Sequence, residues 1–116
     1  MAFTEIISGS VKKIKWAWTT DASGDVSETT SNAYSGEVIL LTTVPGTGGD
    51  APTDLYDLTV EDPDGIDVLA GIGGDRSDTN TEHVRSTSHG AAVGALTFTV
   101  ENGGNAKSGT AIIWVR

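Results

Sequence analysis

Residues 54–70, DLYDLTVEDPDGIDVLA, constrain the fold of this chain more than any other stretch. Within them, Tyr56, Leu58 and Val60 alternate with polar residues, and a period of two is typical of a half-buried β-strand. The sequence Asp-Pro-Asp-Gly follows at residues 62–65. It suits a tight turn, because proline presets φ and glycine accepts a positive φ. The stretch therefore predicts two β-strands joined by a short hairpin loop.

The hairpin also carries three closely spaced acids, Asp62, Asp64 and Asp67, which resemble part of a calcium-binding loop. A complete EF-hand loop has about twelve residues, flanking helices and a closing glutamate. Strand alternation instead predicts that Ile66 and Val68 face the core while Asp67 points into solvent. We interpret the acids as the polar side of a turn, and a cation site near them stays open as an alternative.

Further runs of alternating or β-branched residues predict the remaining strands. They cover residues 11–20, 26–30, 32–44, 81–86, 95–101 and 109–116. Turn-forming residues separate these runs at intervals of roughly ten residues, a spacing typical of all-β domains. The sequence therefore predicts an all-β fold of about seven or eight strands without significant helix. The expected architecture is an antiparallel two-layer β-sandwich of Ig-like or jelly-roll type.

A chain of 116 residues has the size of one domain. We expect residues 11–116 to form a single β-sandwich domain. Residues 1–10 contain apolar side chains among small polar ones, which leaves three interpretations open. The segment is an edge strand, a loosely held tail, or an arm that docks on a neighbouring subunit.

Two tryptophans dominate the first predicted strand, residues 11–20. Ile14, Trp16 and Trp18 share one face of it, whereas Lys13 and Lys15 occupy the other. Buried tryptophans contribute on the order of 200 Å² each to a core, so we expect this face to point inward. The alternative is an exposed aromatic platform for stacking or sugar binding.

Apolar residues on both faces of a strand predict a central position or contact with another subunit. In residues 32–44, alternation places Val38 and Leu40 on one face and Ile39 and Leu41 on the other. The last strand has the same two-sided pattern. Together with the apolar residues near the N-terminus, the second faces supply the candidate subunit or capsid interface: Phe3, Ile6, Ile7, Ile39, Leu41, Ile112 and Trp114.

The formal net charge of −9 argues against nucleic acid as a partner, because phosphates would repel this surface. Ten of the sixteen acids lie within residues 50–82, where Arg76 is the only base. The chain has no cysteine, which excludes disulfides and thiol chemistry. Its apolar runs are far shorter than the roughly twenty residues of a membrane span. The N-terminus lacks the pattern of a secretory signal, so we expect neither membrane association nor export.

The sequence offers no motif for chemistry. Residues 45–53 form a Gly/Pro loop without the lysine and following helix of a phosphate-binding loop. His83 and His89 lie near Ser86 and Ser88, but the nucleophile elbow of a hydrolase is missing. We therefore predict that the protein is not an enzyme, with no catalytic, cofactor-binding or metal-binding residues and no cofactor.

Two long strings resemble a small structural protein that recurs among tailed bacteriophages and prophages. The first is GDAPTDLYDLTVEDPDGIDVLAGIGGDRSDTNTEHV, residues 49–84, and the second is GALTFTVENGGNAKSGTAIIWVR, residues 94–116. The similar features are the APTD-x-YD start, the short D-G-x-D-V hairpin, the L-T-x-T-V strand, the N-A-K-x-G turn and the aliphatic–aromatic–Arg ending. The resemblance covers more than half of the chain and is less specific over the first 45 residues.

The resemblance implies a non-enzymatic virion structural protein, and within that class we expect a capsid decoration, or cement, protein. Such a protein binds the lattice of the major capsid protein or other virion proteins, stabilises the head, and forms a homo-oligomer such as a trimer. Its location is the capsid surface of the virion, after synthesis in the bacterial cytoplasm. A tail or head–tail connector component is the nearest alternative. A carbohydrate-binding β-sandwich that uses Trp16, Trp18 or Trp114 is an alternative of another class.

Overall fold

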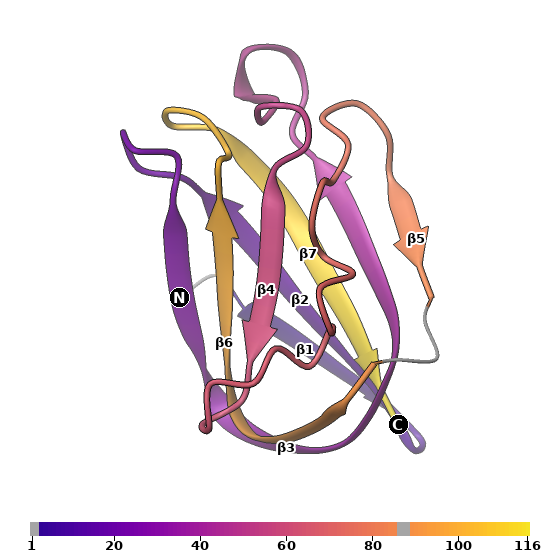
Figure 1. The fold of residues 1–116 in the computed structure, drawn as a ribbon. Coiled ribbons are helices and arrows are strands. Elements are labelled where there is room, and N and C mark those ends of the chain that lie inside the picture. The colour runs from indigo at the N-terminus through magenta and orange to yellow at the C-terminus, as the bar shows by residue number, and fades with distance from the viewer. Residues whose placement is uncertain (1–2, 86–88) are drawn as a thin grey trace.

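A computed structural model describes residues 3–85 and 89–116, and seven β-strands make up most of this part of the chain (Figure 1). The strands are β1 (Phe3–Ser8), β2 (Val11–Thr19), β3 (Val26–Pro45), β4 (Asp57–Glu61), β5 (Glu82–Val84), β6 (Ala91–Glu101) and β7 (Ser108–Val115). The helical structure in the described residues is one short 3₁₀ turn, η1 (Gly48–Asp50). Every strand pairing is antiparallel. The prediction of an all-β antiparallel fold without significant helix is confirmed.

The strands form one continuous sheet in the order β1-β2-β7-β3-β6-β4, and β5 pairs with β3 outside this path. The long strand β3 joins two halves of the sheet. Its first part, residues 26–37, pairs with β6, and its second part, residues 38–45, pairs with β7 and β5. Figure 1 shows β3 sweeping round the base of the molecule, with β4 and β6 in front of β2 and β7. We call β1, β2, β7, β5 and the second part of β3 the large half, and β4, β6 and the first part of β3 the small half.

Aromatic contacts hold the inner surfaces of the two halves together. The rings of Trp16 on β2 and Phe98 on β6 lie 5.6 Å apart at a steep angle, and Phe3 on β1 stacks on Trp16. Near the other end, the rings of Trp18 and Tyr56 lie 5.3 Å apart. Such edge-to-face pairs add to the energy of area burial. The predicted inward face of residues 11–20 is therefore confirmed, since Ile14, Trp16 and Trp18 all lie in the core.

A β-bulge in β3 changes which side chains face inward. The pairing of β3 with β7 shifts its register between Val38 and Leu40. Because a bulge adds one residue to a strand, the side chains beyond it exchange faces. Val38 and Leu41 are both buried in the core, whereas Leu40 lies on the opposite face, beside Trp114 of β7. The predicted grouping of Val38 with Leu40, and of Ile39 with Leu41, is wrong for this reason.

The hairpin at residues 54–70 is confirmed in its first half only. Strand β4 buries Leu58 and Val60, but the return consists of a single bridge between Glu61 and Asp67, followed by turns. The carboxylate of Asp67 accepts hydrogen bonds from the backbone N–H groups of Val60, Leu69 and Gly71. It caps a turn that ends the strand, so the prediction that Asp67 points into solvent is wrong.

The same turn exposes a residue that alternation places inside. Ile66 is 60% exposed, although Val68, two residues later, is buried as predicted. The carboxylate of Asp62 accepts hydrogen bonds from the N–H groups of Asp64 and Ile66. These local bonds compete with strand pairing at this position. Asp62 and Asp67 are thus explained by the backbone N–H groups that their carboxylates bind in the turn.

The N-terminal segment contains a regular strand. β1 pairs along its whole length with β2 and lies at the end of the sheet order. Residues 3–8 therefore form an edge strand, which is one of the three interpretations of residues 1–10, and they are not a loosely held tail.

Glycine at position 109 allows Trp18 to cross β7. A Cβ atom at Gly109 would lie 2.5 Å from Cζ2 of Trp18, which is closer than packed atoms approach. We expect Gly109→Ala to destabilise the protein by about 1–3 kcal/mol through overpacking. Urea denaturation measures the change. Gly49→Ala is the matched control, because a Cβ there meets nothing within 4 Å; equal stabilities of the two variants would contradict this packing.

Both tyrosines of the chain ionise at a higher pH than a free tyrosine does. Burial raises the pKa of Tyr34 and of Tyr56 to about 12, and the Glu5 carboxylate adds to the shift of Tyr34. Because the unfolded pKa is about 10, the native state holds these protons longer. The stability that these two tyrosines contribute is therefore fully present below pH 10 and is lost as the pH rises towards 12. Ultraviolet titration of the phenolates should show no step near pH 10 in the native protein and two tyrosines titrating there in denaturant.

Candidate protein-binding face

The side of the large half that points away from the core forms a continuous surface, which we call the outer face. Residues paired directly across antiparallel strands share a face, so the register defines its members. The first row is Ile6, Lys13, Trp114 and Leu40; the second is Thr4, Lys15, Ile112, Thr42 and His83; the third is Ala17, Thr110 and Val44. Opposite neighbours of these residues along each strand, such as Ile14 and Ile113, are buried in the core.

The outer face carries lysines and no carboxylate among its described residues. The strands of the large half contain two acids, Glu5 and Glu82. Glu5 pairs in register with Ile14, and Glu82 pairs with Thr43, and both of these partners are buried. The two acids therefore belong to the inward side of their strands. The chain has sixteen acids and seven bases, so an outer face with Lys13 and Lys15 and no acid departs strongly from the average.

Trp114 is the centre of a polar and aromatic cluster on this face. Its Nε1–H donates to the Thr42 hydroxyl at 3.4 Å, and the same hydroxyl lies 2.9 Å from Nδ1 of His83. The Lys13 ammonium lies 5.0 Å from the centre of the Trp114 ring, within the range of a cation–π interaction. These contacts fix the orientation of a large half-buried ring, and a fixed ring loses little entropy when a partner covers it.

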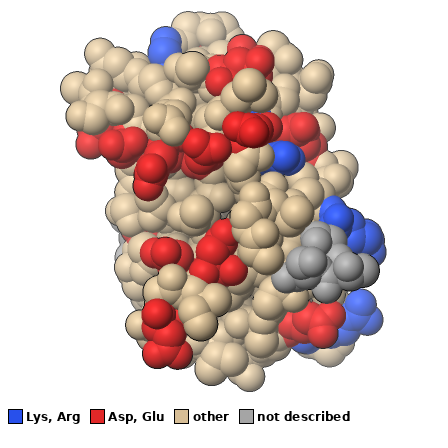
Figure 2. Space-filling model, viewed as in Figure 1, with Lys and Arg blue, Asp and Glu red and all other residues tan. Residues whose placement is uncertain are grey.

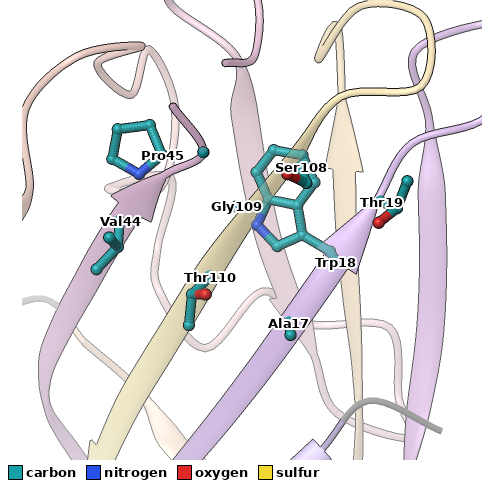
Figure 3. Close-up of a pocket in the computed structure, with 9 residues that line it drawn as sticks. Ala17, Trp18, Thr19, Val44, Pro45, Ser108, Gly109 and Thr110 are labelled. Atoms are coloured by element: carbon teal, nitrogen blue, oxygen red, sulfur yellow. The ribbon is translucent and has the colours of Figure 1, made fainter. Parts of the chain in front are cut away.

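A shallow hollow of about 500 Å³ adjoins this cluster at the end of the outer face (Figure 3). Its lining includes the third-row residues Ala17 and Thr110, together with Gly109 and Pro45. The side chains of Ala17 and Thr110 are small and leave space above the sheet at this end of the outer face. The outer face thus places the Trp114–Lys13 pair beside a neighbouring depression, a relief that suits a shaped protein surface.

The small half presents the opposite charge. Figure 2 shows this side of the molecule, with acids spread over it and few bases. On β4 and β6, Asp57 pairs with Glu101, and Glu61 lies at the other end of β4. The Asp57 carboxylate accepts hydrogen bonds from Asn102 and from the N–H of Asp75. The charge of the molecule is therefore divided between an acidic side and the lysine-bearing outer face.

The predicted interface residues are distributed over three environments. Ile6, Ile112 and Trp114 lie on the outer face, with Ile112 almost buried among its neighbours. Ile7 is 61% exposed and lies on the other side of β1, and Ile39 is half-buried at the bulge. Phe3 packs against the core, and Leu41 is fully buried within it, so a partner cannot reach Leu41 in this fold.

Sequence reasoning missed Leu40 and the position of the lysines beside Trp114. Leu40 reaches the outer face only through the bulge in β3, which has no clear signature in the sequence. Lys13 and Lys15 alternate with buried residues in residues 11–18, and the sequence already places them together on one face of the strand. Their position beside Trp114 depends on the pairing of β2 with β7.

Within residues 3–85 and 89–116, no three His, Asp or Glu side chains are placed to hold a metal ion. His83 is engaged with Thr42 on the outer face. Ser86 and Ser88 lie outside the described residues. Among the described segments, none is a helix with the length and apolar character needed to cross a membrane.

The comparisons with known proteins give no family for this chain. A scan against protein-family models finds no match, and a search among curated proteins finds no similar sequence. The geometry of the described residues therefore carries the functional argument.

The exposure of the tryptophans can be measured by acrylamide quenching. Trp16 and Trp18 are buried, and Trp114 is only half-buried. We expect Trp114→Phe to remove most of the quenching of the native protein, because the two remaining indoles are shielded. The same variant in urea is the control, since both should then be quenched freely. Strong quenching of native Trp114→Phe would contradict the inward orientation of Trp16 and Trp18.

Proposed function

We propose that this protein is a non-enzymatic structural protein of a tailed-bacteriophage virion, acting as a capsid decoration (cement) protein. It binds the lattice of the major capsid protein on the capsid surface and stabilises the head. The family resemblance of residues 49–84 and 94–116 motivates the choice of particle. The observation that carries the proposal is the acid-free outer face with its Trp114–Lys13 cluster.

Charge separation gives the outer face a direction for docking. A surface that bears Lys13 and Lys15 attracts an acidic partner, and the acidic remainder of the chain turns away from it. Complementary charge mainly raises the association rate and selects the orientation of the encounter. Once the complex forms, burial of a fixed aromatic ring contributes much of the affinity, and tryptophan is the residue most enriched at such positions. Trp114 is therefore the expected anchor, and the lysines provide steering.

The fold itself suits a protein that reinforces a shell. Antiparallel pairing links every strand on the path from β1 to β4, and aromatic contacts hold the two halves together. Such a module resists deformation, so it transmits load between the neighbours that it bridges. An enzyme needs a reactive group placed beside a substrate cleft, and the described residues supply the hollow of Figure 3 without such a group.

The carbohydrate-binding alternative loses most of its residues. A sugar platform requires exposed aromatic rings beside polar groups. Trp16 and Trp18 are buried in the core, so Trp114 is the remaining candidate. The Lys13 ammonium lies close to its ring, where it competes with a stacked sugar. Protein binding uses this arrangement better, because the lysine and the ring are both retained in the contact.

The copy number in the purified particle tests the proposal. A decoration protein covers the capsid lattice, so quantitative mass spectrometry should find hundreds of copies on the head. A ring of roughly six to twelve copies would assign the protein to the connector or tail instead, because such assemblies are single closed rings with cyclic symmetry. Absence from the particle would refute a virion function altogether.

Charge reversal tests the docking face. Lys15→Glu should weaken binding to expanded capsids that lack the protein by about tenfold at low salt, with a smaller effect at high salt, because screening reduces the attraction. Lys107→Glu is the matched control, since it makes the same charge change outside the three rows of the outer face, just before β7, where its ammonium donates to the carbonyl of Gly49. Equal effects of the two variants would show that only net charge matters.

A truncation tests the anchor. Trp114→Ala should weaken capsid binding roughly 10- to 100-fold, as expected for the removal of an interface hot spot. Sedimentation of capsid-bound against free protein measures the loss, and urea denaturation checks that the variant remains folded. Full binding by folded Trp114→Ala would exclude the outer face as the docking surface.

A further inference from the structure

The sheet has one long terminal strand whose free flank is uncovered in the described structure. The terminal strands are β1 and β4. Residues 66–76 cover the flank of β4. The Leu58 N–H donates to the carbonyl of Gly73, and the Arg76 N–H donates to the carbonyl of Tyr56. β5, which branches from β3, has three residues. β1 has six residues and pairs with β2 alone, so its outer backbone groups are available to another strand.

β1 has few of the features that protect a free edge. Proteins commonly shield such strands with lysine, proline, a bulge or an inward-pointing charge. The sequence of β1, FTEIIS, has neither lysine nor proline, its register with β2 runs without a shift, and Glu5 is its one charged residue. A weakly protected edge of this length is a template for strand addition.

The exposed side chains of β1 indicate how a partner approaches. Ile6 is 51% exposed and Ile7 is 61% exposed. As neighbours in a strand, they project to opposite faces: Ile6 pairs with Lys13 on the outer face, and Ile7 pairs with Lys12 on the other. A partner that covers one face of the sheet shields only one of them. A strand that continues the sheet contacts both, because its own side chains alternate in the same way.

We propose that β1 pairs edge to edge with β1 of a second copy of this chain, antiparallel and centred on Ile6. This register brings the two Ile6 side chains together on the outer face and places Glu5 opposite Ile7 of the partner. Centring the pair on Glu5 would bring two carboxylates together, which is destabilising. A self-pairing strand also needs only one free edge per molecule, and a twofold contact uses the same patch on both copies.

The geometry of this pairing fixes the relation of the two outer faces. Directly opposed residues share a face, so an Ile6–Ile6 pair continues the outer face of one copy into that of the other. The twofold axis then runs perpendicular to the sheet, and both Trp114–Lys13 clusters point the same way. In this register residues 4–8 of each copy are paired, and so short a contact buries less area than a standard interface of about 1,600 Å², so we expect weak, concentration-dependent dimers. The inference concerns the isolated protein and does not depend on the proposed virion function.

A single cysteine tests the register directly, because the chain has no cysteine of its own. Opposed residues of an antiparallel pair have Cα atoms about 4.5–5.5 Å apart, which a disulfide can bridge. Ile6→Cys should therefore form a covalent dimer rapidly under mild oxidation, as seen on non-reducing gels. Val93→Cys is the matched control, since Val93 lies on β6 and is 59% exposed. Equal rates of dimer formation by the two variants would overturn the proposal.

Sedimentation without any cross-link provides a second readout. The unmodified protein should show a monomer–dimer equilibrium, and Ile7→Glu should shift it to monomer, because the new carboxylate would lie opposite Glu5 of the second copy and like charges opposite each other are destabilising. Val93→Glu introduces the same charge at an equally exposed valine and should leave the equilibrium unchanged. A strictly monomeric unmodified protein at high concentration, or an Ile7→Glu variant that still dimerises, would also refute the pairing.

Discussion

The bulge in β3 between Val38 and Leu40 is the constraint on which the outer face depends. One added residue lets a single strand of twenty residues serve both halves of the sheet with its apolar side chains inward on each. Without it, Leu41 would point away from the core and Leu40 would be buried. The bulge therefore decides which aliphatic residue lies beside Trp114, and it gives a strand with two apolar faces one side that faces the core and one side that belongs to the outer face.

The separation of charge follows from the same arrangement. The strands of the large half carry their acids, Glu5 and Glu82, on the inward side, where Glu82 is paired with Arg76 at 3.6 Å. Many of the other acids lie in turns, and several are engaged by backbone N–H groups, as Asp62 and Asp67 show. These acids stabilise the turn geometry while they make the rest of the surface repel an acidic partner. Turn stability and the proposed docking direction thus depend on the same carboxylates.

The periodicity of the sequence predicts which side of a regular strand is buried. It correctly gives the strand of Trp16 and Trp18 and the buried side of β4, because alternating side chains must face a core. It fails for Ile66, where the Asp62 and Asp67 carboxylates satisfy backbone groups and end the ladder. The lysine row is visible in the sequence. Its position beside an aromatic ring is not, because that contact depends on pairing between strands far apart in the chain.

The two proposals, docking by the outer face and pairing through the β1 edge, support each other. A lattice presents its binding sites repeatedly at fixed spacing, so a dimer with both outer faces on one side can engage two sites at once. The second contact is then intramolecular, and avidity can exceed either single affinity by about 10²–10⁴ without any new contact, provided the spacing matches. Weak pairing through Ile6 is suited to this role, because the lattice itself raises the local concentration of copies. Strong pairing in solution would instead fix one spacing before the lattice is reached.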